Sequence, residues 1–326
     1  MQSVELSRKM HANVTAMWMV GVALFFVLLT GSMETMLPDQ GDQGLALPSP
    51  GLWPFSPLWS ALINLGLNFL IMVMMVVVNG AFNVMRATSR LPVGLFAIMQ
   101  AAVPRELLVF NSGTLLALAV ITCIYLMFSC WDHPWPVRRV FLVFVILSLG
   151  CAVQYCFLVF VPVFLLMCAQ MRIFNTRTLL AAFLGCATVW INLLGFGIVD
   201  LDDFHLPEVQ SIFAAPDLMD VLYMLIVAGL TAALLLTATL LNVVKTIAYN
   251  ARARAYNGAL VLVALVAFAA MVLNYNNVLA YLPLLNMCAA YQLTHYFVNH
   301  TFDRQYVAVL SVAGVYVLLY LWRIVI

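Results

Sequence analysis

The sequence predicts an all-α fold: a polytopic transmembrane helical bundle of about eleven spans, within a range of roughly ten to twelve, with a cytoplasmic N-terminus. Three observations predict it. Hydrophobic residues make up 65% of the 326 residues and charged residues only 8%, whereas a soluble domain carries about 25% charged residues. The apolar residues form long runs, and the basic residues lie in alternate loops between them. Charges this few cannot coat a soluble globule of this size, so the soluble classes of protein are excluded.

Eleven apolar runs follow one another along the chain. They cover residues 13–31, 59–83, 88–104, 113–129, 140–155, 157–171, 178–198, 219–243, 258–273, 278–297 and 306–324. About 20 apolar residues suffice to cross a bilayer as a helix. The run 88–104 is short and contains Pro92 and Pro104, and only a tight break at 154–156 separates the fifth run from the sixth. We interpret residues 1–326 as one integral membrane domain with two longer extracytoplasmic loops, 32–58 and 199–218.

The basic residues determine the predicted orientation, because short cytoplasmic loops are rich in Lys and Arg. With the N-terminus inside, the inner segments carry Arg8, Lys9, Arg86, Arg90, Arg138, Arg139, Arg172, Arg177, Lys245, Arg252, Arg254 and Arg304. The outer segments carry only Arg105 and Arg323. A missed or additional helix would invert every later loop and destroy this separation. It therefore favours eleven spans, and it favours a crossing rather than a re-entrant run at 88–104.

Composition and motifs exclude several functions. The net charge of +1 is not that of a strongly basic nucleic-acid binder. The seven cysteines lie in or beside apolar runs without C-x-x-C spacing, which is typical of small buried hydrophobic residues. The five histidines are scattered and show no H-E-x-x-H pattern, so a zinc enzyme is not expected. The sequence identifies no cofactor.

The acidic segment at the start of the second outer loop is the sharpest candidate for chemistry. It contains Asp200, Asp202, Asp203, His205 and Glu208. Carboxylates at this density can bind a divalent cation, and such a cation would neutralise a lipid-linked diphosphate. The alternative is that these acidic residues are simply solvated on the outer surface, and the spacing matches no established motif. Both interpretations remain open, and these five residues are the catalytic candidates.

Amides inside the predicted spans are candidates for ligand binding. Asn64 and Asn68 are four residues apart, as are Asn79 and Asn83, and together the four span about 100° of one helix face. Polar groups in a bilayer must face a partner helix or a cavity. The stripe is therefore either structural or part of a polar pathway, and we expect it to face protein rather than lipid. His295 is a further candidate, because an ionisable residue within a span suggests function.

The inner loops supply a third set of candidates. Arg86, Arg172 and Arg177 lie in short basic loops, where arginines bind the phosphates of lipid head groups. The alternative is that they only set the topology. The predicted partners are the lipid bilayer, anionic or lipid-linked phosphate head groups and a further membrane protein, with no nucleic acid. Within this region, Asn175 is placed to cap the helix that follows.

The middle of the chain resembles a family of multi-pass inner-membrane proteins of the Bacteroidota, over about residues 60–200. The resemblance rests on Phe157-x4-Pro162-x-Phe164, on Met171-Arg172-x-Phe174-x-x-Arg177-Thr178-x-Leu180-Ala181-Ala182-x-x-Gly185, on Asn64 with Asn68, on Asn79-x3-Asn83 and on Leu91-Pro92. The family is a domain of unknown function. Some members are labelled beta-carotene monooxygenase, but such oxygenases resemble soluble β-propellers with four iron-binding histidines. The resemblance therefore implies a location in the inner membrane and a lineage, without an activity.

Two functional hypotheses follow. The first is a non-enzymatic component of the cell envelope: a membrane subunit, a scaffold or a permease-like bundle. The second is a membrane-embedded transferase that acts on a lipid-linked sugar or phosphate at the outer face. A lipid-sized groove beneath the acidic loop would favour the transferase, and a sealed bundle would favour the scaffold. A transporter requires broken helices that meet near the middle of the membrane.

Overall fold

A computed structural model describes residues 2–31, 46–85, 89–200, 202, 218–246, 249–274, 277–299 and 305–325. These residues form twelve α-helices and two 3₁₀ turns, without a strand. The helices are α1 (Gln2–Gly31), α2 (Pro57–Phe82), α3 (Leu91–Ala101), α4 (Pro104–Leu108), α5 (Ser112–Phe128), α6 (Val137–Val153), α7 (Phe160–Gln170), α8 (Thr176–Gly195), α9 (Leu218–Thr246), α10 (Ala251–Leu273), α11 (Val278–Asn299) and α12 (Gln305–Val325). The 3₁₀ turns are Pro50–Leu52 and Tyr155–Phe157. The predicted all-α helical bundle is confirmed.

Every predicted apolar run contains most or all of one helix. In the run 88–104 the helix α3 ends at Ala101, and the last residue of the run, Pro104, begins the five-residue α4. Proline has no N–H to continue the hydrogen-bond ladder and its ring clashes with the preceding turn, so α3 stops before Pro104. The predicted break between the fifth and sixth runs is present: Gln154 is extended and a 3₁₀ turn leads into α7.

Within the described ranges, six helices are long and apolar enough to cross a membrane. They are the segment 13–31 of α1, α2, α8, the segment 222–246 of α9, α10 and the segment 307–324 of α12. Large apolar side chains cover their outward faces, among them Trp18 at 72% exposure and Leu273 at 82%. An apolar surface of this extent is stable against lipid and not against water. The chain is therefore a membrane protein.

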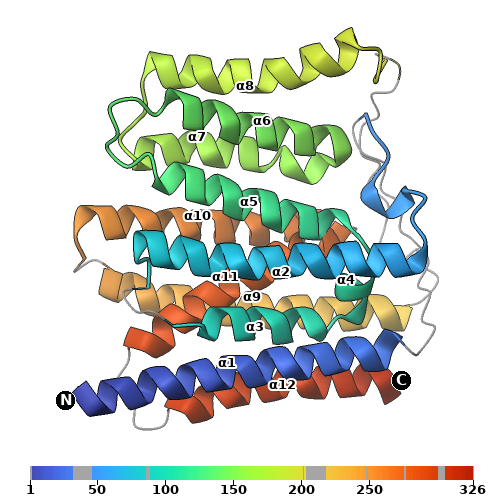
Figure 1. Ribbon diagram of the computed structural model, residues 1–326, viewed down its shortest axis with the longest axis vertical. Coiled ribbons are helices and arrows are strands. Elements are labelled where there is room, and N and C mark those ends of the chain that lie inside the picture. Colours follow the sequence, from blue (N-terminus) through green and yellow to red (C-terminus); the bar gives the residue numbers. More distant parts are fainter. Residues whose placement is uncertain are drawn as a thin grey trace.

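The helices lie side by side with their axes roughly aligned, and the connections gather at two ends (Figure 1). The turn from α5 to α6, the turn from α7 to α8 and the starts of α1 and α10 lie at the left of the view. Arg138, Arg139, Arg172, Arg177 and Arg252 belong to these connections or to the helix turns beside them. The arrangement therefore brings the described basic residues of the predicted inner loops to one end of the bundle.

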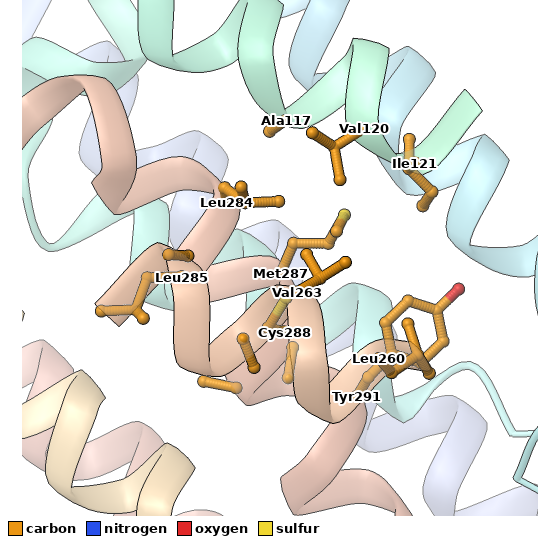
Figure 2. Packing of buried hydrophobic residues seen from close by; sticks show 14 of the residues in the cluster. Ala117, Val120, Ile121, Leu260, Val263, Leu284, Leu285, Met287, Cys288 and Tyr291 are labelled. Atoms are coloured by element: carbon orange, nitrogen blue, oxygen red, sulfur yellow. The ribbon is translucent and has the colours of Figure 1, made fainter. Parts of the chain in front are cut away.

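Helix α11 forms the centre of the bundle and is buried along almost its whole length. It packs against α3, α5, α9 and α10. Figure 2 shows its Leu284, Met287 and Tyr291 beside Val120 of α5 and Val263 of α10. The hydroxyl of Tyr291 donates to the backbone carbonyl of Met75 in α2 at 2.7 Å. A hydrogen bond therefore supplements the apolar contacts that hold this helix.

The contact between α5 and α11 depends on a glycine. Pro283 lies inside α11 and cannot donate a helical hydrogen bond to the carbonyl of Leu279, four residues earlier. The backbone of Gly113, at the start of α5, lies against this carbonyl. A Cβ at position 113 would overlap the Leu279 oxygen and lie 3.0 Å from Cδ of Pro283. The two helices approach this closely only because residue 113 has no side chain.

Candidate functional site in the bundle centre

A chain of side-chain amides crosses the centre of the bundle. Asn286 of α11 donates to Oε1 of Gln100 at 2.7 Å, and Gln100 of α3 donates to Oδ1 of Asn68 at 3.1 Å. Asn68 of α2 in turn donates to the backbone carbonyl of Asn64 at 3.0 Å. The four side chains are at most 2% exposed. The amide chain therefore joins three helices and is closed to solvent in this conformation.

The amide chain lies where α3 is interrupted. Helix α3 has 11 residues, which span about 16 Å at 1.5 Å per residue, against a hydrocarbon core of about 30 Å. Gln100 belongs to its last turn, and the backbone carbonyl of Ala102 just beyond accepts a hydrogen bond from the hydroxyl of Tyr223 in α9. Non-helical backbone is tolerated at membrane depth only where protein groups or water satisfy it. Tyr223 supplies such a group.

A second polar group joins α9 to α11. Asn242 donates from Nδ2 to both the backbone carbonyl and Oε1 of Gln292, at 2.8 and 2.9 Å. His295, one turn further along α11, is 2% exposed, and its ring centroid lies 5.9 Å from that of Tyr249. The predicted candidate His295 thus lies inside the protein rather than reaching out to the membrane surface.

Buried polar atoms without a hydrogen-bond partner among the described residues include Oδ1 of Asn286 in the amide chain and Oδ1 of Asn242 in the second group. The same holds for Oγ1 of Thr239, which lies one turn before Asn242 in α9. An unsatisfied buried donor or acceptor costs about 1–3 kcal/mol. Carboxamides and hydroxyls donate and accept hydrogen bonds without ionising. Among the Asp, Glu, Lys and Arg residues whose side chains the structure describes, none is buried. The centre is therefore suited to hydrogen bonding with a neutral polar group.

The predicted asparagine stripe divides into two parts. Asn64, Asn68 and Asn79 are buried, which confirms that these three face protein. Asn79 accepts a hydrogen bond from the backbone N–H of Met85 at 3.1 Å. Asn83 is exposed and ends α2 in the left-handed conformation, with φ of 49°, a position that suits asparagine. The second pair thus closes the end of α2, whereas the first pair belongs to the central amide chain.

The basic candidates lie at the surface. Arg172 and Arg177 are exposed, with guanidinium carbons 5.5 Å from the ring centroid of Trp131 and 5.8 Å from that of Trp135. Arg86 lies outside the described residues. The predicted cap on the next helix is confirmed: Asn175 and Thr178 form a reciprocal capping box at the start of α8. The basic candidates and the central amides thus belong to separate regions of the molecule.

Most of the acidic candidates lie outside the described residues. This applies to Asp203, His205 and Glu208, whereas Asp200 and Asp202 are described and exposed. Within the described ranges no three His, Cys, Asp or Glu side chains form a group that could hold a metal ion. The predicted cation site in this loop therefore stays a prediction.

The sequence analysis missed Gln100, which links the other amides. Its signal was a single carboxamide in an otherwise apolar run, just before the proline that ends the helix. Asn192 and Gln154 are further carboxamides in the predicted apolar runs. Asn192 is exposed and donates only to the carbonyl of Thr188 in its own helix. Gln154 is buried at the end of α6. A buried amide in an apolar run therefore indicates a site only where it lies at a helix break or faces an amide of another helix.

The fold and the buried amides together define a polytopic α-helical membrane protein. No protein-family profile, curated protein or solved structure matches the chain significantly.

Proposed function

We propose that the chain is a non-enzymatic, permease-like component of the cell envelope that binds a small neutral polar solute at its centre. The observation that carries this proposal is the amide chain of Asn68, Gln100 and Asn286 at the end of an interrupted helix. Broken helices near the middle of the membrane are a common way to build a solute site in a transporter. The inner membrane is the proposed location, in keeping with the family resemblance and the distribution of basic residues.

The unpartnered atoms favour a permease over a scaffold. A scaffold needs amides only as contacts between helices, and buried acceptors without partners weaken such contacts. In Asn286 the side-chain Nδ2 donates a hydrogen bond, whereas the buried Oδ1 accepts none. The same is true of Asn242. A solute or water that bonds to these acceptors would recover the cost. The side chains that line the centre are carboxamides and hydroxyls, which favour a neutral solute over an ion.

The test is whether water reaches the centre, because a permease must open it and a scaffold need not. Ala97 lies one turn before Gln100 in α3 and is 7% exposed. The variant Ala97→Cys, in proteoliposomes, is treated with the water-soluble reagent 2-sulfonatoethyl methanethiosulfonate, and modification at position 97 is followed by mass spectrometry. We expect slow but complete modification from the aqueous phase, since every opening event exposes the site.

The matched control is Ala264→Cys in α10. Ala264 is 1% exposed and belongs to the apolar core, and the substitution is the same. We expect no modification at position 264 over the same period. If position 97 stays as unreactive as position 264 in folded protein and both react after denaturation, the centre does not open. The scaffold interpretation would then replace the permease.

A further inference from the structure

Two loops at the basic end of the bundle are joined to each other. They are residues 129–136 between α5 and α6, and residues 171–175 between α7 and α8 (Figure 1). The backbone N–H of Asp132 donates to the carbonyl of Met171 at 3.2 Å. Asp132 and Arg172 both adopt the left-handed conformation, with φ of 49° and 60°. The joined loops therefore hold their side chains in a defined arrangement.

Trp131 lies at the centre of this arrangement. The guanidinium carbon of Arg172 lies 5.5 Å from its ring centroid, and the ring of Tyr256 lies 6.1 Å away. The hydroxyl of Tyr256 accepts from Nε of Arg252 at 2.7 Å and donates to the carbonyl of Phe128 at 2.9 Å. We call Trp131, Arg172, Arg252 and Tyr256 the Trp131 cluster. It links two arginines, 80 positions apart in the sequence, through the neighbouring rings of Trp131 and Tyr256.

More positive charge surrounds the Trp131 cluster. Arg139 donates to the carbonyl of Ser129, and Arg177 lies 5.8 Å from the ring centroid of Trp135. Asp132 is the single carboxylate in residues 129–139 and 171–177, all of which are described. The contacts that these arginines make within the described residues are with ring faces, a hydroxyl and a carbonyl, and none is with a carboxylate. Among the described side chains, therefore, no carboxylate compensates this positive charge.

We propose that the Trp131 cluster binds the phosphate of an anionic membrane lipid. Arg172 lies over the ring of Trp131, which leaves its N–H edges available to a phosphate in a bidentate manner. Arg252 uses Nε–H for the hydroxyl of Tyr256 and keeps the edge formed by its two Nη groups. Arg172 and Arg252 are both exposed. Their contacts with Trp131 and Tyr256 restrict the two side chains before a ligand arrives, which lowers the entropic cost of binding.

The surrounding apolar side chains indicate that the phosphate belongs to a lipid. Trp135 and Phe174, on the two joined loops, are 69% and 55% exposed. On α8, just after Arg177, Leu180 and Phe183 are 59% and 69% exposed. Exposed aromatic residues beside arginines at the end of a helical bundle are typical of the head-group level of a membrane. A lipid bound there places its phosphate at the arginines and its acyl chains along α8.

The experiment is native mass spectrometry of the full chain in detergent, titrated with phosphatidylglycerol and, separately, with phosphatidylcholine. The test variant is Arg172→Gln/Arg252→Gln. The matched control is Arg323→Gln, because Arg323 makes the same kind of contact, 5.9 Å from the ring of Tyr223, in α12. We expect the test variant to bind phosphatidylglycerol about 25-fold more weakly, at about fivefold per arginine. The control should retain the affinity of the unmodified chain.

Equal binding of phosphatidylglycerol by the test variant and the unmodified chain would overturn the proposal, as would equal binding of phosphatidylcholine and phosphatidylglycerol by the unmodified chain. Inorganic phosphate at millimolar concentration should not displace the lipid, and complete displacement would assign the cluster to a soluble phosphate compound instead. If the glutamine variant does not accumulate, Arg172→Lys/Arg252→Lys keeps the charge and removes the planar edge. Unchanged affinity in the lysine variant would overturn the guanidinium assignment.

Discussion

The hydroxyl groups of Thr30 and Tyr320 lie 2.7 Å apart, although 290 positions separate the two residues in the sequence. Both oxygens also lie within hydrogen-bond distance of the backbone carbonyl of Phe26, at 2.8 and 2.9 Å, so one hydroxyl donates to this carbonyl and the other donates to its partner hydroxyl. The ring of Tyr320 stacks on that of Phe26 with centroids 3.8 Å apart. These contacts hold the first helix against the last in a region where lipid cannot replace a lost hydrogen bond.

Tyr320→Phe should lower the free energy of unfolding by about 1 kcal/mol, because it removes the hydroxyl and keeps the stacked ring. Unfolding of the purified protein in mixed micelles with increasing dodecyl sulfate measures the change. Tyr125→Phe is the matched control, since the Tyr125 ring contacts Phe82 and no hydrogen bond of its hydroxyl is present among the described residues. A loss of the same size in both variants would assign the effect to ring packing and contradict the prediction.

Gln100→Leu should destabilise the bundle by about 1–3 kcal/mol, because Asn68 and Asn286 each lose their side-chain partner within the amide chain. The same dodecyl sulfate titration applies. Asn192→Leu makes a similar amide-to-apolar change at an exposed position whose amide bonds only its own helix, and it should be nearly neutral. If Asn192→Leu lowered the free energy of unfolding by as much as Gln100→Leu or more, the amide chain would have no specific role in stability.

Gly113→Ala should be strongly destabilising, by about 1–3 kcal/mol, since the new methyl group overlaps the carbonyl of Leu279 where α5 meets α11. Gly66→Ala in α2 is the control, because nothing lies within 4 Å of a Cβ at that position. That control should be neutral or stabilising, as alanine favours a helix more than glycine does. Comparable thermal stability of the two variants, followed by light scattering, would contradict the close approach of α5 and α11.

The native cysteines should react slowly with maleimide at pH 7. Six of the seven are buried and Cys186 is half-buried. Burial raises the pKa of the Cys130 thiol above its usual value, and the charge of the nearby Arg139 offsets only part of this rise. Because the thiolate is the reactive form, the reaction at Cys130 should accelerate at a higher pH than that of a free cysteine. Rapid labelling of Cys130 in folded protein at pH 7 would contradict this.

Because the native cysteines should react slowly with maleimide, introduced cysteines can test the orientation of the chain in the membrane. The two test variants are Ala251→Cys and Asp200→Cys. Residue 251 is the exposed first residue of α10, at the basic end of the bundle, and residue 200 is exposed and follows α8. With the N-terminus inside, an impermeant maleimide added to whole cells should label position 200, and position 251 only after permeabilisation. Labelling of position 251 from outside would invert the predicted topology.

The sequence was sufficient to predict the helices but not how the central ones meet. Composition and the alternating basic loops predicted the all-α bundle, because lipid permits few alternatives for an apolar chain. Asn64 and Asn68 were correctly expected to face protein, since hydrocarbon offers an amide no partner. Gln100 was missed because its role in the site depends on a hydrogen bond with Asn286, which lies 186 positions away in the sequence. No local pattern encodes such a pairing, and Asn83 shows that equal spacing can instead mark a helix end.

The basic candidates illustrate the same limit. The sequence placed Arg172 and Arg177 in an inner loop, but it gave no reason to connect either of them with Arg252. That connection passes through Trp131 and Tyr256 and depends on the α5–α6 loop reaching the start of α10. Contacts between distant loops follow from the packing of entire helices, which no pattern along a single segment specifies.

The burial of α11 has a consequence for biogenesis. It is the central helix, yet its amides, histidine and proline keep it out of the group of helices apolar enough to cross a membrane alone. Such a segment partitions poorly into lipid and needs other helices to cover its polar face. The four helices that surround it, α3, α5, α9 and α10, all precede it in the chain. During synthesis, α11 therefore leaves the ribosome after the four helices that surround it. It can then insert by packing against these helices, without first crossing the lipid as an isolated helix.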